Sequence, residues 1–152
     1  MWQQITYAHE HTTIDLSGVK KDVDCRLDEF AQTLAEFKNL KKLGVARIID
    51  VTARGMGRNL AYVQKMSEAS GLKILVSTGY YKEPFLPPEV YELSEQELAQ
   101  IMIRELTAGI EGSGLKASLI GEIGTSQGQM EPVERKVFRA AARAHLETGA
   151  PL

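Results

Sequence analysis

The feature that most constrains the fold is a regular alternation of two kinds of segment. Short apolar runs rich in β-branched residues, typical of buried strands, alternate with longer segments whose apolar residues recur with the period of an amphipathic helix. The predicted strands span residues 4–11, 45–52, 72–79 and 116–124, and the predicted helices span residues 27–43, 59–71, 94–108 and 132–148. Because helical crossovers return the chain in the same direction, this order predicts a parallel sheet covered by helices.

Residues with strong positional preferences mark the ends of these elements. Gly44 and Gly149 follow the first and last predicted helices, where a left-handed backbone conformation ends a helix at low cost. Ser94, with Glu97 three residues later, forms a capping-box pattern before the third helix. The segment after the first strand is predicted to be a polar loop up to about Cys25. Three prolines predict that the segment 80–93 contains neither a helix nor a central strand.

Two α/β architectures fit this order. One is a self-contained doubly wound sheet, and the other is the first half, four β/α units, of a TIM-type (β/α)8 barrel. The first strand–helix connection lacks the G-x-G-x-x-G pattern, and GMGRN is too short to cradle a phosphate. After the last predicted helix, APL begins a further apolar run, as the fifth strand of a barrel would. We therefore expect residues 1–152 to form a single domain that is half of a barrel.

Composition narrows the class of protein. The chain has 152 residues, 43% hydrophobic and 25% charged, which is typical of a globular domain. A net charge of -2 and the lack of Lys/Arg tracts provide no basic surface for nucleic acid or a membrane. The start MWQQITYAHEH lacks the features of a signal peptide, and the single cysteine, Cys25, excludes an intramolecular disulfide. We expect a cytoplasmic, soluble protein that binds neither nucleic acid nor membranes.

Two of the three histidines, His9 and His11, lie one residue apart at the end of the first predicted strand. Side chains alternate between the faces of a strand, so both imidazoles point to the same side and can hold one metal ion. The pattern alone is also compatible with two unrelated histidines. Glu122, at the end of the fourth predicted strand, favours the metal site, because a carboxylate at a barrel mouth is costly to bury unless it is paired or bound to metal. His9, His11 and Glu122 are the predicted metal ligands.

Several further motifs accompany these residues. In chain order they are AHEHTTIDLSG, DVDCRLDEF, RGMGRN, TGYY, LKASLIGEIGTS and ERKVFRAAARAH. Together they resemble the phosphotriesterase-like family of the amidohydrolase superfamily, and within it the bacterial phosphotriesterase homology proteins. Because the likeness runs through the whole chain in order, it is far more specific than the H-x-H pattern.

This resemblance implies an eight-stranded β/α barrel with a two-metal, usually zinc, centre. It assigns His9 and His11 to the more buried metal and Glu122 to the bridging position, where many relatives carry a carboxylated lysine. In such enzymes, hydroxide generated at the metals attacks an ester-type centre while the second metal polarises its oxygen. Two further histidines and an aspartate of the family's centre would lie beyond Leu152. The resemblance therefore implies the N-terminal half of a hydrolase, which binds a single Zn2+ weakly and is inactive alone.

Other residues near the predicted strand ends have more open interpretations. Asp50 is either an acceptor for a ligand histidine or a residue that binds loop backbone. Tyr80 and Tyr81 are either substrate contacts or ordinary loop aromatics. Arg58 is expected to pair with a surface acid rather than with an anionic leaving group. His145 falls within the last predicted helix, so we expect it outside the site.

The leading functional prediction is a metal-dependent hydrolase that acts on ester-type bonds of small molecules. The alternative is a non-catalytic half-barrel that serves as a binding or assembly module, and metal content distinguishes the two. A small nucleotide-binding domain is disfavoured, because the sequence has no phosphate loop. An open half-barrel exposes two sheet edges and an apolar face, so we expect a homo-oligomer or association with the missing C-terminal half.

Overall fold

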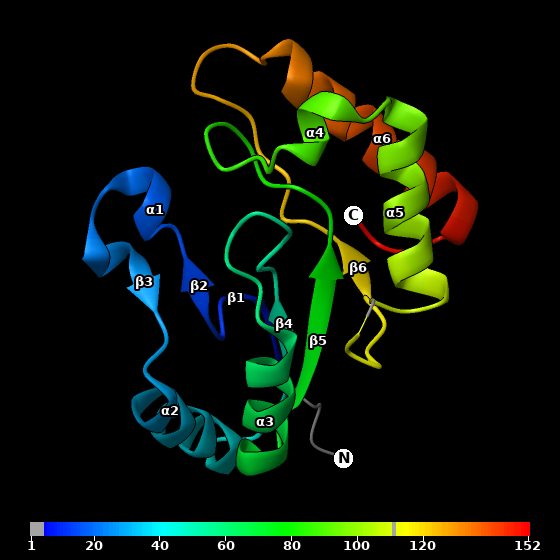
Figure 1. The fold of residues 1–152 in the computed structure, drawn as a ribbon. Coiled ribbons are helices and arrows are strands. Elements are labelled where there is room, and N and C mark those ends of the chain that lie inside the picture. Colours follow the sequence, from blue (N-terminus) through cyan, green and yellow to red (C-terminus); the bar gives the residue numbers. More distant parts are fainter. Residues whose placement is uncertain (1–4, 111) are drawn as a thin grey trace.

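The computed structural model describes residues 5–110 and 112–152 (Figure 1). Its strands are β1 (Ile5–Glu10), β2 (Ile14–Asp15), β3 (Arg26–Leu27), β4 (Val45–Asp50), β5 (Lys73–Thr78) and β6 (Leu119–Ile120). Its α-helices are α1 (Ser17–Lys20), α2 (Phe30–Lys42), α3 (Leu60–Ser70), α4 (Glu89–Glu92), α5 (Glu95–Thr107) and α6 (Pro132–Thr148). A short 3-10 helix, η1, spans Val23–Cys25.

The main sheet contains four parallel strands in the order β1-β4-β5-β6. At one edge of the sheet, Glu10 pairs with Asp50 and Asp50 pairs with Val76. Farther along β5, Thr78 pairs with Ile120 of β6. The carboxyl ends of all four strands therefore point in the same direction, and the prediction of a parallel α/β sheet is confirmed.

Helices cover the sheet in two groups (Figure 1). α2 and α3 contact each other and cover β4 through an apolar cluster that includes Phe37, Ile48 and Met66. α5 and α6 pack side by side, and their shared cluster includes Met102 and Val137. Removing these side chains from water supplies the main driving force for the layered arrangement.

Capping residues mark the starts of α3 and α5 and the end of α6. The Asn59 side chain accepts a hydrogen bond from the backbone N–H of Tyr62 at the start of α3. Ser94 and Glu97 form the predicted capping box of α5. Gly149 ends α6 in the left-handed conformation, with φ of 68°.

The region between β1 and α2 is more ordered than the predicted polar loop. It contains α1, η1 and an antiparallel ribbon in which Ile14 of β2 pairs with Leu27 of β3. Helix α2 begins at Phe30 rather than at Leu27, because Leu27 belongs to this ribbon. Leu27 continues the helical spacing of the apolar residues that follow it, but it lies in the ribbon and not in the helix.

Two further predictions were wrong in detail. The segment 80–93 does contain a helix, α4, which Pro87 and Pro88 directly precede. Proline is compatible with the start of a helix, where its missing N–H would have no intrahelical partner. The fourth predicted strand is reduced to the two residues of β6, because Gly121 follows with φ of 132°, outside the β region.

The segment after α6 returns to the sheet. The backbone N–H of Ile120 in β6 donates to the carbonyl oxygen of Pro151 at 2.9 Å. Residues 150–152 therefore begin to line the free side of β6, where the sequence predicts a further strand. Within residues 5–110 and 112–152, no helix combines the length and the apolar character that a membrane crossing requires.

Candidate metal centre

His9 and His11 lie at the carboxyl end of β1, the outer strand next to β4. Their rings meet edge to face, with centroids 5.7 Å apart, so the two imidazoles stand together on one side of the strand. The His9 side chain is 61% exposed and the His11 side chain is 24% exposed. The predicted pairing of the two histidines is therefore present, with His11 the more enclosed of the two.

Glu122 follows β6 and reaches both histidines. Its Oε2 lies 3.4 Å from Nε2 of His9, and its Oε1 lies 3.5 Å from Nε2 of His11. One potential ligand atom from each of the three residues lies within 4.8 Å of the others. β1 and β6 are three strand spacings apart, about 14 Å in a flat sheet, so the contact requires a sheet that curves toward itself.

The donor set fits a zinc ion. Imidazole nitrogen and carboxylate oxygen are both common zinc ligands. Neighbouring ligand atoms of a tetrahedral site with bonds of ~2.1 Å lie about 3.4 Å apart, which matches the separation between Glu122 and each histidine. The structure thus brings the three predicted ligands together, and their metal binding stays a prediction.

Asp50 supports the backbone around the site rather than a ligand histidine. Its Oδ1 accepts from the backbone N–H of Thr52 at 2.8 Å, and its Oδ2 accepts from that of Thr12 at 2.9 Å. Of the two open interpretations of Asp50, the structure supports backbone binding. The contact to a ligand histidine comes instead from Thr52, whose Oγ1 lies 2.9 Å from Nδ1 of His11.

The two tyrosines after β5 differ in position. Tyr80 is fully buried, and its hydroxyl donates to a carboxylate of α4, so it is a packing residue. Tyr81 is half-buried, stacks on Phe85, and lies so close to Gly124 that a Cβ there would be 2.9 Å from its ring. Burial, and then the nearby Glu122 carboxylate, raise the pKa of Tyr81. A neutral phenol therefore lies beside the candidate centre.

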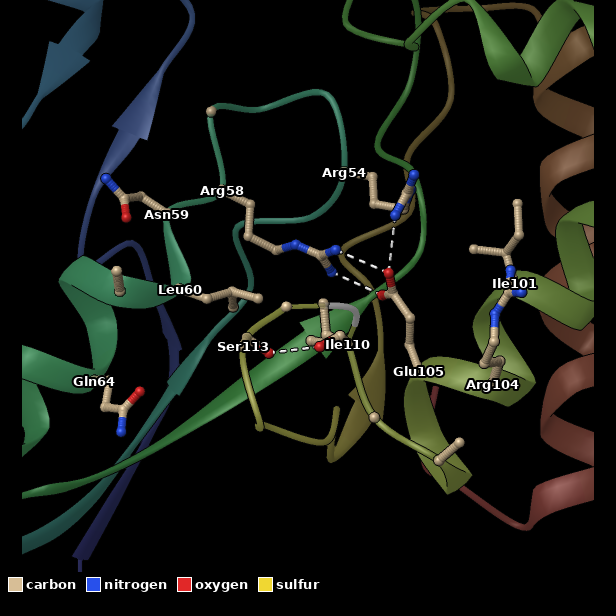
Figure 2. Close-up of a pocket in the computed structure, with 15 residues that line it drawn as sticks. Arg54, Arg58, Asn59, Leu60, Gln64, Ile101, Arg104, Glu105, Ile110 and Ser113 are labelled. Atoms are coloured by element: carbon tan, nitrogen blue, oxygen red, sulfur yellow. Dashed lines mark hydrogen bonds and ion pairs between the residues drawn. The ribbon is translucent and has the colours of Figure 1, made fainter.

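A second concentration of charge lies between α3 and α5, at a cavity of about 1180 Å³. Figure 2 shows Arg54 and Arg58 directed at the carboxylate of Glu105. Arg58 donates to both carboxylate oxygens, at 2.8 and 2.9 Å, and Arg54 donates to one at 2.9 Å. These charges satisfy one another, and the described residues that line the cavity include no histidine or cysteine. We therefore interpret this cluster as structural.

The acid that pairs with Arg58 is buried, contrary to the prediction of a surface acid. Glu105 is 4% exposed. Burial raises its pKa, but the hydrogen bonds and charges of Arg58 and Arg54, with a hydrogen bond from Thr78, outweigh burial and hold the pKa below its ordinary value. Glu105 is therefore a buried, ionised group held by two cations.

The grouped ligand residues include neither His145 nor Cys25. His145 is exposed on α6, and its Nδ1 is 2.7 Å from the carbonyl oxygen of Ala150. Cys25 is a free, half-buried thiol at the end of η1.

Comparison with known proteins decides the family. Residues 3–152 match the phosphotriesterase family. The chain belongs to this family. It is 48% identical over 147 residues to the phosphotriesterase homology protein of Escherichia coli, covering 97% of this chain and 50% of that protein. It is 31% identical to the aryldialkylphosphatase of Saccharolobus solfataricus, covering 97% of this chain and 48% of that protein.

Solved structures of phosphotriesterase relatives show how much of the barrel is present. The crystal structure of the E. coli homology protein, complexed with phosphate in its active site, matches with a TM-score of 0.94 and covers 97% of this chain and 51% of that one. A lactonase from Listeria monocytogenes, 27% identical, matches with a TM-score of 0.88 and covers 97% and 50%. The chain therefore spans about half the length of these relatives, and the predicted half-barrel is confirmed.

The phosphotriesterase family consists of metal-dependent hydrolases, so the hydrolase prediction holds at the level of the family. Two buried carboxylates that hold the surrounding structure were not predicted. Glu105 lies seven residues after Leu98, on the buried face of α5, where an acid in an apolar row indicates a buried ion pair. Glu134, also buried, accepts from the backbone N–H and the hydroxyl of Ser126, four residues after Glu122. The sequence signal for Glu134 is its position three residues after Glu131, which is the spacing of a capping box at the start of α6.

Proposed function

We propose that this chain supplies the ligands of the first and fourth barrel strands to the zinc centre of an ester-bond hydrolase. The proposal rests on one observation: ligand atoms of His9, His11 and Glu122 lie within 4.8 Å of one another at the carboxyl ends of the strands. Functional residues of β/α barrels gather at this end of the strands. The family adds that its members are hydrolases, and the names of relatives include an aryldialkylphosphatase and a lactonase.

The proposed chemistry assigns a role to each side chain. A zinc ion in such a site activates water and polarises an ester oxygen. His9 and His11 would hold it through Nε2, the ring nitrogens that face the carboxylate. Glu122 presents one oxygen to each histidine, so its carboxylate would be the third group to hold the ion.

The centre is incomplete without further ligands. Because the chain spans about half of its relatives, we propose that activity needs the part of the barrel that the relatives have beyond the matched region. The chain alone would bind a single zinc weakly and leave ester substrates unhydrolysed.

The partner of the chain would be that second half or another copy of the chain. The substrate would be a small ester, and the phosphate in the E. coli structure favours an oxyanion-like group. We also propose a single domain in the cytoplasm.

Metal binding by the 152-residue chain tests this proposal. We expect titration with Zn2+ to give one weak site, which His9→Ala, His11→Ala and Glu122→Ala each weaken by at least tenfold, about 1.4 kcal/mol. The matched control is His145→Ala, because His145 is exposed on α6, outside the centre. Equal zinc binding by all variants would contradict the proposed ligands.

The second candidate, a non-catalytic half-barrel that binds a partner, is favoured by the open face of β1. Ile5 and Tyr7 are 47% and 38% exposed on the strand that carries the histidines. Large exposed apolar side chains in a row are typical of interaction surfaces. A chain that binds no zinc but associates through β1 would support this second function and exclude the first.

A further inference from the structure

We propose that Thr52 is the positioning residue that fixes the ring of His11 for metal binding, an inference that rests on the zinc centre proposed above. Thr52 follows the carboxyl end of β4, next to the end of β1. Its hydroxyl oxygen lies 2.9 Å from Nδ1 of His11 and donates to the carbonyl oxygen of Thr13 at 3.0 Å. A single hydroxyl thus contacts both the candidate ligand and the backbone two residues beyond it.

The number of protons fixes the direction of these two hydrogen bonds. A threonine hydroxyl has one proton, and a carbonyl oxygen can only accept. In residues 5–110 and 112–152, the Thr52 hydroxyl is the only hydrogen-bond donor to the Thr13 carbonyl. With that proton given to Thr13, the hydroxyl can only accept from His11, which would place the proton of the neutral ring on Nδ1. Nε2 of His11 then faces Glu122, at 3.5 Å, with a free lone pair.

Thr52 is itself held rigidly. It is 3% exposed, and its backbone N–H donates to Oδ1 of Asp50 at 2.8 Å. The other oxygen of Asp50 accepts from the N–H of Thr12, which adjoins His11, at 2.9 Å. Asp50 therefore ties the ends of β1 and β4 together and fixes the hydroxyl relative to the ring. A metal-bound histidine usually donates its other ring N–H to such an acceptor, which orients the ring and selects its tautomer.

The chain offers a matched pair of substitutions. Thr52→Val removes the hydroxyl at nearly constant volume, and Thr52→Ser retains it. Thr12→Val is the control, because Thr12 is also buried, adjoins His11, and has a hydroxyl that forms no hydrogen bond with any described residue. Two measurements on the 152-residue chain test the role: the dissociation constant for Zn2+, and the tautomer of His11 from nitrogen-15 NMR of the metal-free protein at a pH where the ring is neutral.

We expect Thr52→Val to weaken zinc binding by about 10–100-fold and to shift the proton of His11 from Nδ1 toward Nε2. Thr12→Val and Thr52→Ser should keep both the affinity and the tautomer of the unmodified chain. Should Thr52→Val prove unstable, Thr52→Ala takes its place as the variant without the hydroxyl. Weaker zinc binding and a shifted proton in Thr52→Ala but not in Thr52→Ser support the hydroxyl's role, and equal values in these two variants overturn it.

The two measurements separate this inference from the proposed function. If the unmodified chain binds zinc and Thr52→Val equals Thr12→Val in both affinity and tautomer, the role of Thr52 is overturned and the metal centre stands. If the unmodified chain binds no zinc, the proposed function fails. The tautomer of His11 in the metal-free variants then still decides whether Thr52 orients the ring.

Discussion

At the residue scale, Glu105 is a buried charged side chain whose loss we expect to cost substantial stability. Its side chain is 5% exposed, and it accepts hydrogen bonds from the guanidinium groups of Arg54 and Arg58. Glu105→Gln keeps the shape of the side chain but leaves Arg58 without its carboxylate partner and Arg54 with Glu89 alone. Breaking a buried ion pair in this way lowers the free energy of unfolding by about 3 kcal/mol, which urea denaturation measures.

The matched control is Glu95→Gln on the same helix. Glu95 pairs with Arg143, whose side chain is 58% exposed, so water screens the interaction. We expect this control to lose less than about 1 kcal/mol. Losses of equal size in the two variants would show that burial of the Glu105 pair is energetically unimportant.

The lowered pKa of Glu105 also determines how the stability of the chain should respond to acid. Burial raises the pKa of Glu105, but Arg58, Thr78 and Arg54 together hold it below the ordinary value. As pH falls toward the ordinary pKa of about 4.3, the unfolded chain binds a proton that the native state still excludes. The stability that Glu105 contributes is therefore complete above that pKa and is lost as pH falls through the native pKa. In urea denaturation down to about pH 3, Glu105→Gln should show a shallower acid loss than the unmodified chain.

At the scale of elements, the ends of the long helices could be predicted because their signals are local. Asn59, Ser94 and Gly149 act within one helical turn of the ends that they set. The β2–β3 ribbon could not be predicted, because Ile14 and Leu27 pair across the segment between them and each strand has only two residues. A strand this short shows no period along the chain.

The loop after β4 depends on one glycine that packs against this ribbon. Gly57 has φ of 74°, and a Cβ on it would lie 2.7 Å from the backbone nitrogen of Asp15 in β2. The adjacent Met56 carbonyl accepts a hydrogen bond from that same nitrogen at 3.0 Å. Gly57→Ala therefore requires both a left-handed alanine and a shift of the ribbon.

Gly128→Ala is the matched control, with φ of 78° and no atom within 4 Å of its Cβ position. The control should lose about 1–2 kcal/mol of unfolding free energy, the cost of a left-handed alanine. Gly57→Ala should lose more, and hydrogen exchange at the β2–β3 amides should accelerate only in that variant. Unchanged exchange there would show that the ribbon does not depend on close packing at Gly57.

At the scale of the whole molecule, the convergence of the three candidate ligands could be predicted because a parallel sheet that curves into a half-barrel brings them together. Parallel strands place His9, at the end of β1, and Glu122, after β6, at the same edge of the sheet, and curvature closes the gap between them. The groups that hold this arrangement could not be predicted, because they act across elements. Thr52 contacts His11 from the neighbouring strand, and Glu134 holds the loop after β6 from α6. The capping-box spacing marks Glu134 as a helix cap, but it does not encode the contact with Ser126, and no spacing encodes the contact between Thr52 and His11.

The open face of β1 leads to a prediction about assembly. β1 is an outer strand of the sheet in the part of the chain that the structure describes, and Ile5 and Tyr7 expose 47% and 38% of their surface there. An unpaired edge beside apolar side chains favours association with another chain. We expect analytical ultracentrifugation of the 152-residue chain to show species larger than a monomer, and Ile5→Lys with Tyr7→Lys to shift the distribution toward the monomer.

A substitution at another exposed apolar residue tests whether association depends on β1 or on exposed apolar surface in general. Leu146 is 82% exposed, but it lies on α6 rather than on a sheet edge. Leu146→Lys removes a comparable apolar side chain and adds one positive charge, as Ile5→Lys alone or Tyr7→Lys alone does. It should leave the distribution unchanged if β1 is the contact surface. An equal effect of both substitutions would place the contact elsewhere. A monomer at all concentrations of the unmodified chain would mean that the open edge is protected without a partner, and the sheet would then need no second half to remain soluble.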